Sequence, residues 1–374
     1  MINTHVKKFF FEIETIPGVL QTSYFPSLNG IRGIAIIMVV FSHLRLSFAT
    51  PYTTVFNGSL GVLFFFVLSG FLITTLCLKE KIITHDISLK NFYVRRILRI
   101  FPVAYLFILV IIALNFIFKL NISWINIAGT SLYLINFTSY FRKYHHSYYT
   151  GHFWSLSVEE QFYLIVPFIL KKSFKTFLLA ILFIVFIIPV IIGLQYLFIS
   201  LNNNYLLYAF AHYFIKFQPI AVGCLFAVIA FKYEFKQSAL IKVIANLIAF
   251  ALVFLLRYDD FFSLRDMLVG IVSSFLIAYI IISNLSPGTD LIFKILNNKF
   301  LNLVGVLSYS IYIWQEIFTS DDGKLPFYIG TFPFNLIWII VISALSYYFY
   351  ESYFLKLKSK FSRIKSAPAT SLEA

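Results

Sequence analysis

Cysteine is nearly absent from this sequence of 374 residues, which contains only Cys77 and Cys224. Both stand in apolar surroundings and far apart, so the sequence has no zinc-type cysteine spacing and we expect no structural disulfide. Charged residues are also scarce, at 12% of the chain, whereas 60% of the residues are hydrophobic and 20% are aromatic. A typical soluble domain has about 25% charged residues. The composition therefore excludes an ordinary soluble enzyme.

Several common site signatures are missing as well. We find no glycine-rich phosphate loop, no Gly-x-Ser-x-Gly nucleophile turn and no zinc signature. His145 and His146 are adjacent in an aromatic stretch, but neighbouring histidines make poor metal geometry, so no metal is expected. Acidic residues are few, with 16 Asp and Glu against 30 Lys and Arg. In a membrane protein such a basic excess belongs to cytoplasmic loops, so it gives no reason to expect a nucleic-acid partner.

Long apolar runs are what the sequence has in abundance. They recur along the whole chain and are typical of helices that cross a lipid bilayer. The sequence predicts an all-α polytopic membrane protein with about ten transmembrane helices. The predicted spans are residues 30–48, 60–78, 100–118, 153–170, 177–199, 207–231, 240–256, 267–285, 300–318 and 327–350.

The apolar stretch 122–137 is short and contains several polar residues. The basic clusters along the chain all fall on one side of the membrane only if this stretch does not cross it. We therefore interpret it as a re-entrant or interfacial segment and place both termini in the cytoplasm. The same reasoning divides the chain into an N-terminal interfacial segment (1–24), a membrane domain (25–353) and a basic cytoplasmic tail (354–374).

Arg32 and His43 are two ionisable residues in the first apolar segment. They are eleven positions apart, so on a helix they share one face and lie about 16 Å apart along the axis. An ionisable residue inside a membrane segment is costly and marks a functional site by default. Two simpler interpretations stay open. Arg32 could be an anchor at the cytoplasmic surface, and His43 could be a neutral histidine bonded to a backbone carbonyl.

Arg96 and Arg99 lie three positions apart at the start of the third span and share a helix face. Together with Arg32 they predict a pocket for an anionic, phosphate-rich ligand, because guanidinium groups bind phosphate oxygens in pairs. The alternative is that the cluster binds lipid headgroups and sets the topology.

Glu159 and Glu160 are adjacent carboxylates near the start of the fourth span. Neighbours on a helix point about 100° apart, so we expect one of them to serve a site and the other a structural partner. Ser155 shares a face with Glu159. A histidine paired with a carboxylate is a general-base arrangement, which suggests His43 with one of the two glutamates.

Other polar residues inside the predicted spans are more typical of packing contacts between helices. This group includes His212, Lys216, Ser308, Tyr309, Tyr312, Gln315, Glu316 and Glu351.

Five motifs in order carry a resemblance to a known family. They are Arg32 with His43, FFFVLSGFL at 64–72, RRILRIFP at 95–102, HFWSLSVEEQFY at 152–163 and SYSIYIWQ at 308–315. In this order they resemble the acyltransferase family 3 membrane proteins, which O-acylate bacterial glycans. The resemblance covers nearly the whole chain.

The resemblance implies an acyl-CoA donor, such as acetyl-CoA, used at the cytoplasmic face of the bacterial inner membrane, and a glycan or lipid-linked sugar as acceptor. It implies binding roles for Arg32, Arg96 and Arg99 and catalytic roles for His43 with Glu159 and Glu160. Supporting positions are Ser69, Trp154, Ser155, Tyr309 and Gln315. Relatives often carry histidine where Gln315 stands.

The mechanism expected from the sequence has two ends. The arginines hold the CoA phosphates, and His43, oriented by Glu159 or Glu160, removes the proton of a sugar hydroxyl that attacks the thioester. A covalent acyl-enzyme on Ser69 or His43 stays open. The competing function is a non-enzymatic transporter or flippase of a lipid-linked glycan, which predicts a polar path through both halves of the chain.

Overall fold

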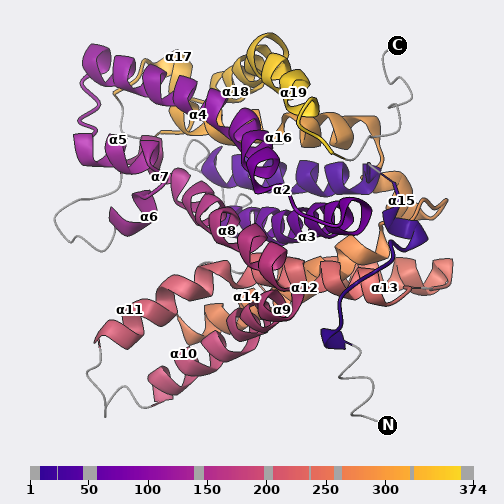
Figure 1. The fold of residues 1–374 in the computed structure, drawn as a ribbon. Helices are drawn as coiled ribbons and strands as arrows, with labels where there is room; N and C mark the ends of the chain where they lie inside the picture. The colour runs from indigo at the N-terminus through magenta and orange to yellow at the C-terminus, as the bar shows by residue number, and fades with distance from the viewer. Residues whose placement is uncertain are drawn as a thin grey trace.

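The computed structural model describes residues 9–22, 24–44, 57–138, 147–197, 205–235, 237–256, 263–320 and 324–363. These residues form helices and contain no strand, which confirms the all-α prediction (Figure 1). His145, His146 and several predicted outer-loop residues, including Pro51, 202–204, 259–260 and 321–322, lie outside the described part of the chain.

The α-helices differ widely in length. They are α2 (Pro26–Leu44), α3 (Gly58–Thr84), α4 (Leu89–Phe118), α5 (Trp124–Ser131), α6 (Ile135–Thr138), α7 (Tyr148–Gly151), α8 (Phe153–Lys172), α9 (Phe174–Leu182), α10 (Ile188–Leu197), α11 (Tyr205–Phe214), α12 (Gln218–Lys232), α13 (Ala239–Leu255), α14 (Leu264–Ser283), α15 (Leu291–Leu296), α16 (Lys299–Phe318), α17 (Phe327–Gly330), α18 (Phe334–Leu345) and α19 (Ser352–Ser359). Two π-helical segments, η4 (Phe183–Ile187) and η6 (Ser346–Glu351), join α9 to α10 and α18 to α19.

Seven helical stretches among the described residues are long and apolar enough to cross a membrane. They are Pro26–Leu44, Gly58–Thr84, Leu89–Phe118, Phe174–Gln195, Phe210–Lys232, Leu264–Ser283 and Phe334–Ser359. The structure therefore supports a multi-pass membrane protein. The other three predicted spans correspond to α8, α13 and α16, of which α13 has 17 residues and the other two have 20 each.

The stretch 122–137 forms only the short helices α5 and α6, with eight and four residues. At 1.5 Å per residue α5 is about 12 Å long, too short for a hydrocarbon core of about 30 Å. The side chain of Asn115 on α4 fixes the entry to α5, since its Oδ1 accepts from the Ile122 amide at 2.9 Å. These lengths agree with a segment that does not cross.

The start of α4 corrects one predicted boundary. The helix begins at Leu89 rather than at residue 100, because the Ser88 hydroxyl accepts from the Asn91 amide and caps it. Arg95, Arg96 and Arg99 therefore lie inside the helix and not in a preceding loop. Their orientations are fixed by the helix, which allows them to face one space.

The centre of the molecule is a stack of four long helices in the order α16, α2, α3, α12 (Figure 1). Glycines allow the closest approaches. Gly70 on α3 lies against the backbone of Ile220 on α12, and Gly33 on α2 lies against the backbone of Leu301 on α16. A side chain at either glycine would collide with a neighbouring carbonyl oxygen, so these helix pairs depend on glycine.

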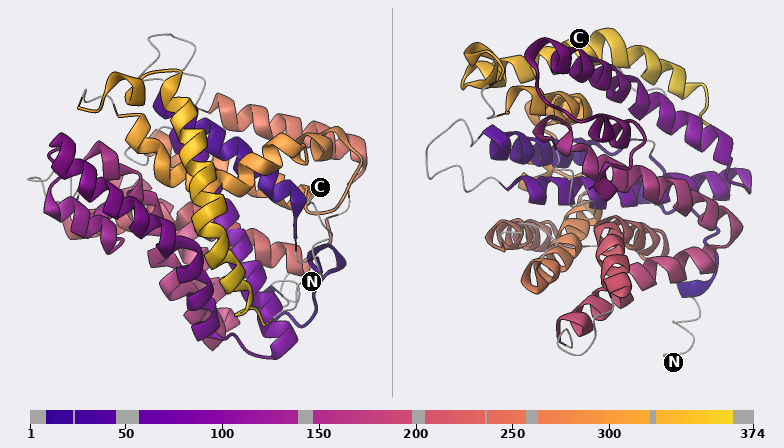
Figure 2. Two further views of the ribbon diagram at one scale, coloured as in Figure 1. Left: turned by 90° about the horizontal axis from the view of Figure 1, so that it is seen from above. Right: turned by 90° about the vertical axis from the view of Figure 1, so that its left-hand side faces the viewer.

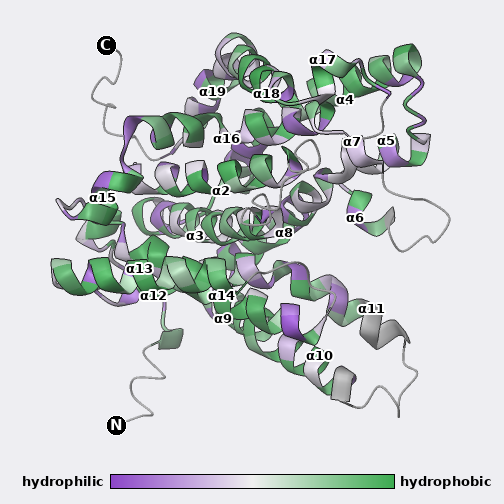
Figure 3. Cartoon of the chain, turned by 180° about the vertical axis from the view of Figure 1, so that it is seen from behind, coloured by the Kyte–Doolittle hydropathy of each residue, from purple (hydrophilic) through white to green (hydrophobic). Residues whose placement is uncertain are grey.

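The outer surface of the helices is strongly apolar. Hydrophobic residues make up much of α13 and α14 (Figure 3). Large side chains such as Leu240, Leu255 and Phe349 are exposed by 70%, 76% and 82%. Such exposure suits contact with lipid tails rather than water.

Segments near both ends of the described chain contact the same end of α3. Near the N-terminal end, Glu12 forms an ion pair with Lys81 of α3 at 3.0 Å. Near the C-terminal end, the Phe361 carbonyl accepts a hydrogen bond from Arg95 Nη1 on α4, and Arg95 Nη2 donates to Glu80 of α3. Residues 334–359 run along the outside of the bundle beside α4 (Figure 2). The side of the membrane that this end of the molecule faces stays a prediction. The division of the chain into three parts also stays a prediction.

Cys77 and Cys224 are both free and buried. No disulfide joins them, as the sequence led us to expect.

Candidate active site

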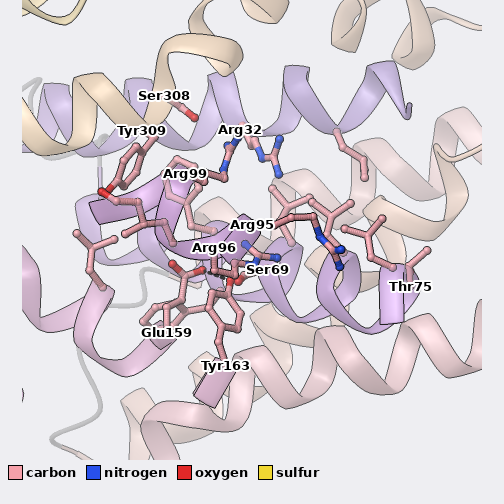
Figure 4. A pocket seen from close by; sticks show the side chains of 18 of the residues that line it. Arg32, Ser69, Thr75, Arg95, Arg96, Arg99, Glu159, Tyr163, Ser308 and Tyr309 are labelled. Atoms are coloured by element: carbon pink, nitrogen blue, oxygen red, sulfur yellow. Dashed lines mark hydrogen bonds between the residues drawn. The ribbon is translucent and has the colours of Figure 1, made fainter. Parts of the chain in front are cut away.

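A cavity of about 460 Å³ lies between α2, α3, α4, α8, α16 and the last described helix, α19. Six basic residues line it, and Glu159 is its single lining carboxylate among the described residues. The basic residues are Arg32, Lys79, Arg95, Arg96, Arg99 and Lys358. Figure 4 shows Arg32 from α2 and the three arginines of α4 around one space, with Glu159 and Tyr163 on the side nearest Arg96 and Ser69. The predicted binding residues therefore converge.

Arg32 is oriented by its own helix. Its Nη1 donates to Asn29 Oδ1 at 3.2 Å, and Asn29 Nδ2 in turn donates to the Tyr24 hydroxyl at 2.9 Å. Arg99, Arg96, Glu159 and Tyr163 all lie close enough to Arg32 to interact with it electrostatically. The guanidinium group is held in place and leaves its remaining N–H groups for a ligand.

Arg96 is fixed by aromatic rings instead. Its guanidinium lies 4.6 Å from the centre of the Tyr163 ring and 5.8 Å from that of Phe92. Stacking on rings orients the planar group without using its hydrogen-bond donors. The cavity therefore holds several cations with donors available, an arrangement that favours a multiply charged anion.

Glu159 faces this cavity and Glu160 does not line it. The Tyr163 hydroxyl donates to Glu159 Oε1 at 3.1 Å, and Ser69 also lies beside the carboxylate. The two glutamates thus separate as their helical spacing predicts. Glu159 offsets part of the positive charge contributed by Arg32 and Arg96.

At its deeper end the cavity is lined by Ser155 and Tyr312, whose hydroxyl oxygens lie 2.6 Å apart. The Tyr312 hydroxyl also lies 3.0 Å from the backbone carbonyl of His152, to which it can donate. These two hydroxyls link the cavity to a second group of residues beyond it.

This second group consists of two histidines around one carboxylate. His152 Nδ1 lies 2.7 Å from Glu316 Oε2, and the His152 backbone amide donates to the same oxygen at 3.2 Å. The other carboxylate oxygen, Oε1, lies 3.9 Å from His43 Nε2, while His43 Nδ1 lies 3.4 Å from Gln315 Oε1. Glu316 and His152 are almost fully buried, whereas the His43 side chain is 29% exposed. His43 is thus the accessible member of the group.

The expected pairing of His43 with Glu159 or Glu160 is wrong. Its carboxylate partner is Glu316, and its amide partner is Gln315. The reason is the position of each residue along α8: Glu159 lies seven residues, or about 10 Å, from His152, which is level with His43. Glu159 therefore lies closer to the arginines than to His43.

Glu316 is not among the predicted site residues, because polar residues inside a span are more typical of packing contacts between helices. The signal was available, since a carboxylate inside an apolar helix is costly wherever it occurs. His152 was read only as part of a motif. Its role as the second partner of Glu316 depends on α8 meeting α16, which no spacing in the sequence shows.

Of the supporting residues, Gln315 contacts His43, and the other four fall into two groups. Ser69, Ser155 and Tyr309 line the cavity, and the Tyr309 hydroxyl donates to the Ile100 carbonyl at 2.8 Å. Trp154 does not line it. The Trp154 ring packs against Phe66 and lies under the Lys216 ammonium, so it supports the cavity wall from behind.

Glu351 has a structural environment, in agreement with the sequence analysis. Its Oε1 accepts from the hydroxyls of Ser310 at 2.6 Å and Ser346 at 2.9 Å. No group of three or more metal-ligating side chains occurs within the ranges that the structure describes.

A family model described as an acyltransferase domain matches residues 25–351. The chain belongs to this acyltransferase family. The resemblance drawn from the five motifs is therefore confirmed, and it extends over most of the chain.

Relatives of this chain include proteins from Staphylococcus aureus whose names contain O-acetyltransferase. The protein named "Putative O-acetyltransferase SACOL0978" (strain COL) is 30% identical over 368 residues, which cover 89% of this chain and 58% of the relative. O-acetyltransferase OatA (strain NCTC 8325 / PS 47) is 28% identical over 355 residues, covering 88% of this chain and 57% of the relative. The chain thus spans less than two thirds of the length of these relatives. No solved structure matches it.

Proposed function

We propose that this protein is an integral membrane O-acyltransferase that moves an acyl group, most simply acetyl, from acyl-CoA to a hydroxyl of a cell-surface carbohydrate. The observation that supports it is the link between a cation-lined cavity and the histidine–carboxylate group around His43. The cation-lined cavity suits a phosphate-bearing donor, and the histidine–carboxylate group suits removal of a proton from the acceptor. Membership of the acyltransferase family supports the same assignment.

The donor would bind with its phosphates among Arg32, Arg96 and Arg99. Guanidinium groups that keep their donors available bind phosphate oxygens by charge-assisted hydrogen bonds. The narrow pantetheine arm would then extend past Ser155 and Tyr312 toward His43. The eleven residues between Arg32 and His43 correspond to about 16 Å along α2, a distance of the same order as the length of that arm.

The chemistry assigned to His43 is general-base catalysis. His43 takes the proton of the acceptor hydroxyl while the hydroxyl oxygen attacks the thioester carbonyl. The carbon–sulfur bond breaks, an ester forms, and the departing CoA thiolate receives the proton from His43. Glu316, held by His152, stabilises the imidazolium that forms in between. An acyl-enzyme on Ser69 or on His43 is the alternative to direct transfer.

We infer the class of acceptor from the relatives. The names of two of them contain O-acetyltransferase. The five sequence motifs resemble a family that O-acylates bacterial glycans. We place the protein in the inner membrane with the cationic cavity open to the cytoplasm. This orientation follows from the basic clusters, which favour the cytoplasmic side.

The test is a comparison of wild type, His43→Ala and Arg99→Ala in detergent, with acetyl-CoA as donor. Wild type should bind acetyl-CoA and release CoA in the presence of an acceptor sugar. His43→Ala should bind with unchanged affinity but lose turnover, and Arg99→Ala should lose binding. Arg265, which lies outside the cavity and is mostly exposed, provides the matched control Arg265→Ala.

Full activity of His43→Ala would overturn the base assignment. A wild type that binds no acyl-CoA of any chain length would overturn the enzyme proposal itself. In that case sugar-lipid movement across vesicles would be the next measurement, because the transporter function requires no thioester.

A further inference from the structure

Lys358 brings a positive charge into the cavity from the far end of the chain. It lies on α19, whereas the other lining cations come from α2, α3 and α4. The charges that act most strongly on Lys358 are those of Arg99, Arg96, Arg32 and Arg95, all of the same sign. Like charges gathered in a partly buried space repel one another, so a bound anion would stabilise the arrangement.

Two of the six lining cations are already engaged. Lys79 Nζ donates to the Thr22 carbonyl at 2.7 Å, and Arg95 contacts both the Phe361 carbonyl and the Glu80 carboxylate. Arg32, Arg96, Arg99 and Lys358 remain, facing the single carboxylate of Glu159. Lys358 has no carboxylate partner within the described residues.

The segment that carries Lys358 is fastened to the rim of the cavity. Arg95 Nη1 donates to the Phe361 carbonyl at 2.8 Å, and Arg363 lies 3.8 Å from Glu80, which also binds Arg95 at 3.0 Å. Lys358 itself is partly buried, while Ser359 and Lys360 are exposed. Lys358 therefore lies at the rim of the cavity, and the residues that follow it hold its segment there.

The direction of the donor decides which of its phosphates reaches the rim. Under the proposed function, on which this inference rests, the thioester points toward His43 at the deep end. Coenzyme A carries a diphosphate nearer the thioester and a 3′-phosphate on the ribose farther from it. The 3′-phosphate thus lies at the end of the molecule that faces the rim.

We infer that Lys358 completes a four-cation site with Arg32, Arg96 and Arg99, and that it binds the 3′-phosphate of the donor. Four cations exceed what a diphosphate with about two negative charges needs, and a third phosphate adds up to about two more. The site would therefore select coenzyme A thioesters over carriers that end in a diphosphate or a bare pantetheine.

The experiment measures the dissociation constants of CoA and 3′-dephospho-CoA by calorimetry for wild type, Lys358→Met, Lys358→Arg and Lys356→Met. Lys356 is on the same helix but exposed, so it controls for the general loss of one positive charge. Wild type should bind CoA about tenfold more tightly than 3′-dephospho-CoA, as expected for one charge-assisted contact. Lys358→Met should lose this preference by weakening CoA alone, Lys358→Arg should keep it, and Lys356→Met should match wild type.

Equal weakening of both ligands in Lys358→Met, or a wild type that does not distinguish them, would overturn the inference. Because these outcomes are read with a wild type that binds CoA, they leave the proposed function intact. A wild type that binds neither ligand and releases no CoA would instead overturn the proposed function and the inference with it. Size-exclusion profiles and melting temperatures of the four proteins show that each variant is folded.

Discussion

His152 Nδ1 lies 2.7 Å from Glu316 Oε2, so the carboxylate that faces His43 is fixed from behind before any substrate arrives. His152 immediately precedes α8 and Glu316 lies near the end of α16, and both side chains are almost completely buried. The contact joins two helices at the level of His43. A carboxylate held this firmly can orient an imidazole and stabilise its charge without reorganising.

The first prediction concerns Glu316. Glu316→Gln keeps the shape of the side chain but removes the charge that stabilises protonated His43. We expect turnover to fall by about 10²-fold or more, because general-base catalysis contributes on that scale. The affinity for CoA should not change, since Glu316 does not line the cavity. Steady-state kinetics and a separate binding measurement distinguish the two effects.

The control for this substitution is Glu351→Gln. Glu351 is also a buried carboxylate, but it binds Ser310 and Ser346 and lies outside the histidine group. If both variants lost activity equally, Glu316 would be no more than a structural residue.

The second prediction concerns the close approach of α3 and α12. Gly70→Ala places a methyl group against the Ile220 carbonyl, and overpacking of this kind destabilises a protein by about 1–3 kcal/mol. Gly193→Ala on α10 is the matched change, because nothing lies within 4 Å of the new methyl group. It should raise stability slightly, since alanine favours a helix over glycine by about 0.5–1 kcal/mol.

Thermal unfolding in detergent measures both effects. Opposite signs for the two variants are the expected result. Equal melting temperatures would show that the helix pair can separate at no cost.

The third prediction concerns Glu80, which joins the ends of α3 and α4 to the segment after α19. Its carboxylate is 3% exposed, binds Arg95 at 3.0 Å and accepts from the Ser88 amide at 3.0 Å. Glu80→Gln should destabilise the protein by about 3 kcal/mol, because it leaves Arg95 without its charge partner. Amide hydrogen exchange in α19 should rise at the same time.

Asp86→Asn is the comparison. The Lys171–Asp86 ion pair is exposed on both sides, and exposed pairs contribute little to stability. Its loss should leave exchange in α19 unchanged. Increased exchange in α19 for both variants would mean that Glu80 does not hold this segment specifically.

The fourth prediction is a pH dependence at Asp290, in the connection before α15. Burial tends to raise the pKa of Asp290, but hydrogen bonds from the Phe293 amide and from Lys242 outweigh it and lower the pKa. A carboxyl with a lowered pKa stabilises the fold above its unfolded pKa of about 3.9 and loses this effect as the pH falls through the folded value.

The difference in melting temperature between wild type and Asp290→Asn should therefore be constant near neutral pH and shrink below about pH 4. Melting curves in an acid-tolerant detergent measure it. A difference that stayed constant down to pH 3 would contradict the assignment.

The sequence predicted the parts of the site that lie on single helices. Arg32 and His43 on α2, and Arg96 and Arg99 on α4, follow from helical periodicity alone. The separation of Glu159 from Glu160 also followed from the angle between neighbours. These relationships need no knowledge of which helices pack together.

The partner of His43 could not be predicted in this way. Glu316 approaches His43 because α16 packs along α2 through Gly33 and Gly305, a contact between segments about 270 residues apart in the sequence. Two carboxylates on α8 were the more conspicuous candidates. The start of α4 was predicted too late, at residue 100 rather than at Leu89. Charged residues in the first turns of a helix resemble a loop in the sequence.

The cavity is assembled from segments far apart in the sequence, with Arg32 on α2, Tyr312 on α16 and Lys358 on α19. During synthesis the first four long helices enter the membrane well before α16 and α19 exist. A growing chain therefore has arginines in place but neither the carboxylate for His43 nor the rim cation. Under the proposed function, the donor cannot be consumed until α16 and α19 have been synthesised, which separates insertion of the first helices into the bilayer from the onset of catalysis.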